Sequence, residues 1–135
     1  MRHKVVIVDD DAAIRSLFEN AFSGICQLFA AAEGQAALEL IKGEKPDLVF
    51  LDIDMPGVSG LEVLRLMKES GAVSIVWMLT GNEKLEIITE AISLGAAGYL
   101  TKPFEVARIR GILDSVSMPG TGKRSAKPWR VKRKN

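Results

Sequence analysis

The stretch Val49-Phe50-Leu51-Asp52-Ile53-Asp54-Met55-Pro56-Gly57 joins a run of large apolar residues to two carboxylates and a turn. A short apolar run of this kind is typical of a strand that is buried on both faces, and the Pro-Gly pair indicates that a loop follows it. In α/β proteins the functional groups gather at the carboxyl ends of the parallel strands. We therefore expect this strand to deliver Asp52 to a candidate site at the edge of a sheet.

Similar strand-like runs occur on both sides of this stretch, and each is followed by residues with helical apolar spacing. Strands are expected at 5–8, 26–32, 48–51, 73–79 and 99–101, and helices at 12–22, 35–41, 59–69, 83–94 and 105–116. Strict alternation predicts a parallel sheet with helices on both faces. The expected fold is therefore a doubly wound, flavodoxin-like α/β fold with a five-stranded parallel sheet in the order 2-1-3-4-5. This order places the carboxyl ends of the first and third strands side by side.

The charge of the chain is divided unevenly between a body and a tail. Residues 120–135 contain seven of the 18 lysines and arginines and none of the 17 acids, so the first 119 residues carry eleven cations against seventeen acids, a net charge of −6. We expect residues 1–118 to form one domain and residues 119–135 to be a basic, disordered tail, because the tail has few apolar residues. As an alternative to simple solvation, its cations at 123–134 allow contact with nucleic acid, with an anionic membrane or with the acidic body of the protein itself.

Composition also limits the class of protein. No apolar run approaches the roughly 20 residues that span a bilayer, and no signal peptide precedes the first strand, so we expect a soluble cytoplasmic protein. The single cysteine, Cys26, has apolar neighbours and is expected to be a small buried side chain without chemistry.

Polar side chains follow four of the expected strands. Asp9 and Asp10 follow the first strand, Asp52 the third, Thr80 the fourth and Lys102 the fifth. Three carboxylates at one sheet edge repel one another unless a cation neutralises them, and oxygen ligands of this kind favour Mg²⁺. A hydroxyl and an ammonium beside that cation suit the oxygens of a phosphoryl group, which makes Asp52 a candidate nucleophile. The neighbouring Asp11 is interpreted instead as the cap of the following helix.

In these features the chain resembles a receiver domain of the response regulators of two-component phosphorelay signalling. The resemblance extends from about Lys4 to Val116. The matching residues are Asp9-Asp10, Leu51-Asp52-Ile53-Asp54-Met55-Pro56-Gly57, Gly60, Thr80, Gly95-Ala96, Tyr99 and Lys102-Pro103-Phe104.

The resemblance implies a role for each matching position. Asp52 would accept a phosphoryl group from a histidine kinase or phosphotransfer protein. Lys102 would form an ion pair with the phosphate, and its peptide bond to Pro103 is expected to be cis. Thr80 would hydrogen-bond a phosphate oxygen and leave room for Tyr99 to turn inward, so these two residues form the expected switch. The Mg²⁺ ligands would be Asp9, Asp10, Asp52 and the backbone carbonyl of Asp54.

The expected function is that of a stand-alone signalling switch that shifts a surface of the fourth helix, fifth strand and fifth helix to regulate a downstream effector protein. This surface is expected to include Ile87, Ala91, Tyr99, Lys102, Val106 and Arg110. A switch of this kind catalyses its own phosphorylation and dephosphorylation but turns over no separate substrate, and it would be a monomer or weak dimer.

Two other functions are compatible with parts of the sequence. The Asp52-Ile53-Asp54 pair resembles the motif of haloacid-dehalogenase-type phosphatases, although that family begins its chain with the motif and continues it with a threonine. A second alternative is that the protein is a binding module that acts through its basic tail. Steady turnover of a phosphomonoester would favour the first alternative, and salt-dependent binding that requires residues 120–135 would favour the second.

Overall fold

The computed structural model describes residues 3–81 and 85–116, which form five strands and five helices in strict alternation. The strands are β1 (Lys4–Val8), β2 (Gln27–Ala31), β3 (Leu48–Asp52), β4 (Ile75–Thr80) and β5 (Gly98–Thr101). The helices are α1 (Ala12–Phe22), α2 (Gly34–Glu44), α3 (Gly60–Ser70), α4 (Leu85–Ser93) and α5 (Val106–Val116). The start predicted for the fourth helix and the basic tail, 119–135, lie outside the described residues.

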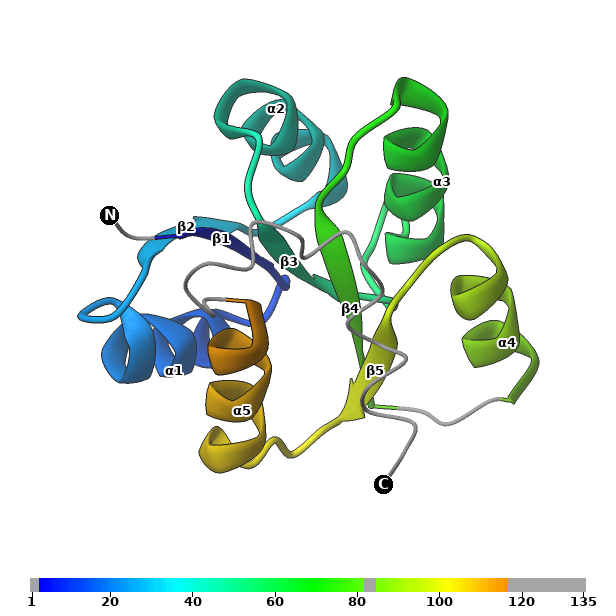
Figure 1. Ribbon diagram of the computed structural model, residues 1–135. Coiled ribbons are helices and arrows are strands. Elements are labelled where there is room, and N and C mark those ends of the chain that lie inside the picture. Colours follow the sequence, from blue (N-terminus) through cyan, green and yellow to red (C-terminus); the bar gives the residue numbers. More distant parts are fainter. Residues whose placement is uncertain (1–2, 82–84, 117–135) are drawn as a thin grey trace.

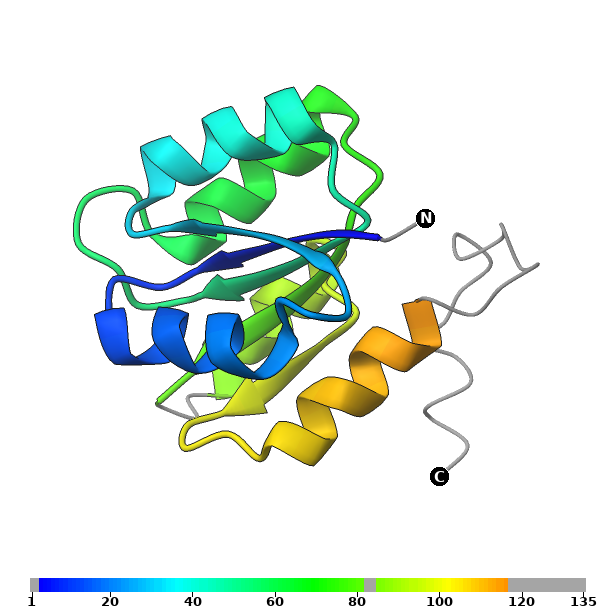
Figure 2. The same ribbon diagram turned by 90° about the vertical axis from the view of Figure 1, so that its left-hand side faces the viewer.

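All neighbouring strands are parallel, and their order is β2-β1-β3-β4-β5, as predicted. Figure 1 shows α1 and α5 on one face of the sheet and α2, α3 and α4 on the other, and Figure 2 shows the sheet between these two layers. The three central strands are almost completely buried because helices cover both of their faces. This arrangement is the predicted doubly wound fold.

Each face of the sheet has its own apolar core. On one face, Phe18 and Phe22 of α1 pack with Phe50 of β3, and the rings of Phe18 and Phe50 lie 5.1 Å apart between centroids. Trp77 and Cys26 are buried in the same cluster, as predicted for Cys26. On the other face, the apolar sides of α2, α3 and α4 cover Val49, Leu51 and Met78. These two cores fix the sheet and leave its carboxyl edge for polar residues.

The structure corrects the predicted boundaries of two elements. The second helix was predicted to end at Lys42-Gly43, but α2 continues to Glu44 because Lys45, in the left-handed region at φ 50°, caps it and donates its backbone N–H to the carbonyl of Ile41. The fourth strand was predicted to begin at Val73, but it begins at Ile75, and Val73 is 85% exposed in the turn after α3. An apolar β-branched residue alone does not decide whether a position is in the sheet.

Two close contacts place the loop after β3. Gly60 begins α3 directly against the backbone of Asp52, where a Cβ atom would overlap the carbonyl oxygen of Asp52. Gly34 at the start of α2 similarly faces Val58, with only 2.7 Å between an added Cβ and the Val58 carbonyl oxygen. Because glycine has no side chain, the N-termini of α3 and α2 can lie close to the edge of the sheet that carries Asp52.

Candidate functional site

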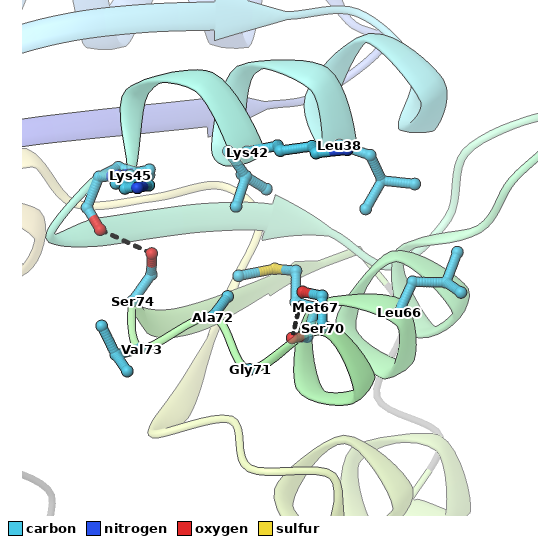
Figure 3. A pocket seen from close by; sticks show the side chains of 12 residues that line it. Leu38, Lys42, Lys45, Leu66, Met67, Ser70, Gly71, Ala72, Val73 and Ser74 are labelled. Carbon is cyan, nitrogen blue, oxygen red and sulfur yellow. Dashed lines mark hydrogen bonds between the residues drawn. The ribbon is translucent and has the colours of Figure 1, made fainter.

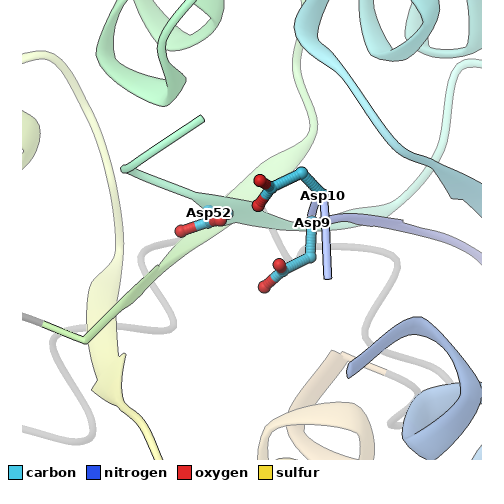
Figure 4. A group of neighbouring side chains, drawn as sticks. All are labelled: Asp9, Asp10 and Asp52. Carbon is cyan, nitrogen blue, oxygen red and sulfur yellow. The ribbon is translucent and has the colours of Figure 1, made fainter. Parts of the chain in front are cut away.

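The carboxyl edge of the sheet brings together three carboxylates from two neighbouring strands. Asp9 and Asp10 follow β1, Asp52 ends β3, and one oxygen of each side chain lies within 4.8 Å of the others. Figure 4 shows the three side chains side by side at this edge. Asp9 and Asp52 are buried and Asp10 is exposed, so the cluster opens to solvent on the side of Asp10. The structure thus unites these three predicted residues.

Backbone groups hold one oxygen of each buried carboxylate. Asp52 Oδ1 accepts a hydrogen bond from the backbone N–H of Asp54 at 3.1 Å, and Asp9 Oδ1 accepts one from Asp11 at 2.9 Å. The second oxygens, Asp9 Oδ2 and Asp52 Oδ2, are buried and accept no hydrogen bond of normal geometry from the described residues. Buried oxygens in this state favour a cation beside them.

Lys102 supplies one cation to the second oxygens. Its Nζ lies 3.0 Å from Asp9 Oδ2 and 3.6 Å from Asp52 Oδ2. Burial by itself would lower the pKa of Lys102, but the carboxylates of Asp9 and Asp52 outweigh it and hold that pKa above its ordinary value. The ammonium therefore stays charged.

One ammonium does not neutralise the cluster. Burial, followed by the charge of Asp9, raises the pKa of Asp52 from its ordinary value of 3.8 to about 7, although Lys102 and the hydrogen bond from Asp54 act in the opposite direction. The raised pKa means that an additional positive charge near Asp52 would favour its ionised form. The donor set of carboxylate oxygens suits a hard divalent cation such as Mg²⁺.

The remaining predicted residues lie on β4, on β5 and in the loops that follow β1 and β5. Thr80 ends β4 and is buried, and the backbone N–H of Lys102 donates to its carbonyl at 2.8 Å. The peptide bond between Lys102 and Pro103 is cis, as expected from the resemblance. Tyr99 lies in β5 beside Met78 of β4 and is 41% exposed. Asp11 caps α1 by accepting from the backbone of Ala13, which confirms its predicted structural role.

The structure changes the interpretation of one predicted residue and adds one residue that was not predicted. Ala91 was expected on the responsive surface, but it is buried in the core beneath α4, so it is no part of that surface. Arg15 was not singled out from the sequence, yet its Nη1 donates to the backbone carbonyl of Asp9 at 2.8 Å. The sequence feature that could have identified Arg15 is its position near the start of a predicted helix, where the macrodipole disfavours a cation.

A separate hollow of about 520 Å³ lies at the opposite edge of the sheet, between the C-terminal ends of α2 and α3 (Figure 3). Its lining is mostly apolar, with Ile41, Pro46 and Met67 buried and Lys42 and Lys45 exposed at the rim. It contains none of the predicted site residues.

The helices give no sign of a membrane span: none in residues 3–81 and 85–116 is long and apolar enough to cross a bilayer.

Comparisons with a family model and with known proteins point to the same family. The family model described as the response regulator receiver domain matches residues 5–114. The chain is 40% identical over 111 residues to sporulation initiation phosphotransferase F of Bacillus subtilis, an alignment that covers 82% of this chain and 90% of that protein. It is also 34% identical to the response regulator MprA of Mycolicibacterium vanbaalenii, where 82% of this chain aligns with only 50% of the relative.

Solved structures agree with the sequence comparison. The signal receiver domain of the NarL response regulator from Mycobacterium tuberculosis superposes with a TM-score of 0.79 at 31% identity, covering 87% of this chain and 98% of that one. The chemotaxis protein CheY4 of Vibrio cholerae gives a TM-score of 0.79 at 27% identity, over 86% and 99% of the two chains. With its parallel sheet in the order 2-1-3-4-5 and its carboxylate cluster at the ends of β1 and β3, this chain belongs to the response regulator receiver domain family.

Proposed function

We propose that this protein is a phosphoacceptor switch in which Asp52 takes a phosphoryl group from the phosphohistidine of a histidine kinase or of a phosphotransfer protein. The observation that carries this proposal is the buried Asp52 carboxylate, with Lys102 Nζ at 3.6 Å and two further carboxylates beside it. A carboxylate oxygen attacks phosphorus, the phosphorus–nitrogen bond breaks, and its electron pair returns to the imidazole. The product is an acyl phosphate on Asp52.

Asp9, Asp10 and Asp52, with the backbone carbonyl of Asp54, would hold Mg²⁺. The two buried oxygens Asp9 Oδ2 and Asp52 Oδ2 support this fit, because among the described residues they face only the single ammonium of Lys102 and accept no hydrogen bond of normal geometry. When bound, Mg²⁺ supplies positive charge that offsets the repulsion between the phosphoryl oxygens and the carboxylates. Lys102 adds a second positive charge on the side of β5, and it stays protonated because the carboxylates hold its pKa above its ordinary value.

Thr80 and Lys102 link phosphorylation to the shape of the protein. The Thr80 hydroxyl would hydrogen-bond a phosphoryl oxygen, and Lys102 would exchange its present ion pairs for one with the phosphate. Phosphorylation shifts the population of conformers only as far as these contacts differ between them. Tyr99, which is 41% exposed in the present conformer, would turn inward when Thr80 moves.

The surface that reports the change would consist of solvent-accessible residues of α4, β5, α5 and the loop between β5 and α5. Tyr99 and Val106 are large apolar side chains that are 41% and 43% exposed, so both are accessible to a partner. The exposed Arg110 and the half-buried Ile87 and Lys102 complete the surface, and the buried Ala91 is excluded from it. A downstream effector protein would bind here with different affinities before and after phosphorylation.

A second role, as an intermediate in a relay, is supported by one comparison. The chain is 40% identical to sporulation initiation phosphotransferase F over 90% of the length of that protein. It covers about half the length of the response regulator MprA and of two probable transcriptional regulators. In a relay, a histidine of a further protein would attack the Asp52 acyl phosphate and regenerate the carboxylate. Residues 1–118 would carry this function, and the basic residues 119–135 would modulate contacts with acidic partners.

The phosphoacceptor proposal is tested with a small acyl phosphate. Incubating the full-length protein with acetyl phosphate and Mg²⁺ is expected to add one phosphoryl group, detected by intact-protein mass spectrometry. Asp52→Asn should abolish the addition, whereas Asp54→Asn should retain it because the Asp54 side chain is exposed outside the cluster. Unmodified wild-type protein, or equal modification of the Asp52→Asn variant, would refute the proposal.

A further inference from the structure

Arg15 is placed where helix formation alone gives no reason for an arginine. It is the fourth residue of α1, close to the end of the helix that carries the positive part of the macrodipole, so a cation there is electrostatically unfavourable. The side chain is half-buried, and its Nη1 lies 2.8 Å from the backbone carbonyl oxygen of Asp9. The guanidinium of Arg15 therefore makes a hydrogen bond to the backbone of Asp9 and is only partly exposed to water.

The carbonyl that Arg15 contacts lies just beyond the end of the strand. β1 ends at Val8, and the completely buried Asp9 follows it. The Asp9 backbone N–H still donates to the carbonyl of Ala31 at 3.1 Å, but no backbone N–H in residues 3–81 and 85–116 donates to the Asp9 carbonyl. A buried carbonyl needs a donor, and the guanidinium of Arg15 provides it with a charge-assisted hydrogen bond.

The turn between β1 and α1 is fixed from two sides. Arg15 holds the carbonyl of Asp9, while the backbone N–H of Asp11 holds Asp9 Oδ1 at 2.9 Å. Asp11 is itself tied to the helix through the backbone N–H of Ala13 at 2.9 Å. The peptide unit that Arg15 contacts is the one that joins Asp9 to Asp10. Its orientation therefore decides where both carboxylates point.

We propose that Arg15 is a positioning residue that holds the Asp9–Asp10 peptide, so that both carboxylates face Asp52 in the arrangement that binds a divalent cation. This inference rests on the proposed Mg²⁺ site. Arg15 contacts neither the cation nor the phosphoryl group; it acts through the main chain of Asp9. Outer contacts of this kind orient ligands around metal sites, and their removal typically weakens metal binding by roughly 10- to 100-fold.

The inference is testable because the two possible roles of Arg15, as a positioning residue or as a nearby charge, predict opposite changes in Mg²⁺ affinity when it is replaced. If Arg15 acted only as a nearby positive charge, its removal would reduce repulsion of the incoming cation and Mg²⁺ would bind more tightly. If Arg15 positions the ligands, its removal leaves the carboxylates less ordered and Mg²⁺ binds more weakly. Arg15→Met removes both the charge and the donor but keeps a side chain of similar length. Arg15→Lys keeps the charge and lacks the planar guanidinium.

The experiment measures Mg²⁺ affinity by isothermal titration calorimetry on the full-length protein after removal of metal by a chelator. Arg15→Met is expected to bind Mg²⁺ about tenfold more weakly than wild type, and Arg15→Lys is expected to fall between the two. The matched control is Arg65→Met, because Arg65 lies on α3, where it pairs with Glu62 and Glu69, and carries the same charge. Its removal should leave Mg²⁺ affinity unchanged.

Thermal unfolding separates positioning from a general effect on stability. A purely structural role would lower the melting temperature equally with chelator and with Mg²⁺, whereas a positioning role also reduces the increase that Mg²⁺ produces. Tighter or unchanged Mg²⁺ binding by Arg15→Met or Arg15→Lys overturns the inference and leaves the proposed metal site intact. Wild-type protein that binds no Mg²⁺ would refute the site itself, and the inference with it.

Discussion

Replacing Asp52 by asparagine should stabilise the metal-free protein, by an amount that grows as pH rises. Burial and the charge of Asp9 raise the pKa of Asp52 from 3.8 to about 7, so folding favours its protonated form. Below the unfolded pKa this group costs the folded state nothing. As pH rises from about 4 to about 7, the unfolded chain ionises first, and the stability of the native protein falls.

The magnitude follows from the two pKa values. A shift of about three units, at about 1.36 kcal/mol each, corresponds to roughly 4 kcal/mol as an upper limit at alkaline pH. Linkage with the same two values gives a loss of about 2.5 kcal/mol between about pH 5 and about pH 8. Asparagine cannot ionise, so the Asp52→Asn variant escapes this loss.

Urea denaturation with a chelator, at about pH 5 and about pH 8, measures the effect. The free energy of unfolding of Asp52→Asn relative to wild type should rise by about 2.5 kcal/mol across this interval. The control Asp114→Asn removes an exposed carboxylate of α5 that pairs with Arg110 at the surface, away from the carboxylate cluster, and its difference from wild type should stay nearly constant. Millimolar Mg²⁺ should shrink the Asp52→Asn effect, because the cation favours ionised Asp52.

A constant difference between Asp52→Asn and wild type at the two pH values would refute the reasoning. It would show that Asp52 ionises in the native state at its ordinary pKa, so that the crowding of carboxylates at the sheet edge costs nothing. An equal pH dependence in the Asp114→Asn control would show instead that the change belongs to the net charge of the protein.

Three other substitutions test separate parts of the structure. Lys102→Met should lower the rate of phosphorylation by acetyl phosphate at least about tenfold, because the ammonium beside the phosphoryl group is lost; a rate near that of wild type in a stopped assay would contradict this role. Gly60→Ala should destabilise the fold by about 3 kcal/mol or more in thermal or urea unfolding, at the upper end for overpacking, since its Cβ would overlap the backbone of β3. Gly43→Ala in α2, with open space around it, should be neutral or stabilising by up to about 1 kcal/mol. Thr80→Ala should still be phosphorylated but should lose the phosphorylation-dependent change in Tyr99 fluorescence or NMR shift; an unaltered change would exclude Thr80 as the link.

Local patterns in the sequence predicted the number, type and order of the elements, because alternating strand-like and helical runs are visible within about ten residues. They also placed the polar residues that follow each strand, and the resemblance to receivers assigned their roles. The errors lie where tertiary contacts decide. Helix α2 passes through Gly43 because Lys45 caps it, and Val73 is exposed because β4 begins only where it can pair with β3.

By itself, the sequence determined that carboxylates, a hydroxyl and an ammonium occupy the ends of successive strands, because the change from apolar to polar residues is a local property of the chain. Only the tertiary structure decided which of these groups interact, since Asp9, Asp52 and Lys102 approach one another through the register of β1 against β3 and the loop after β5. The same holds for the buried position of Ala91 and the contact of Arg15 with Asp9. Burial and hydrogen bonding depend on what packs from elsewhere in the chain, and no local pattern contains that information.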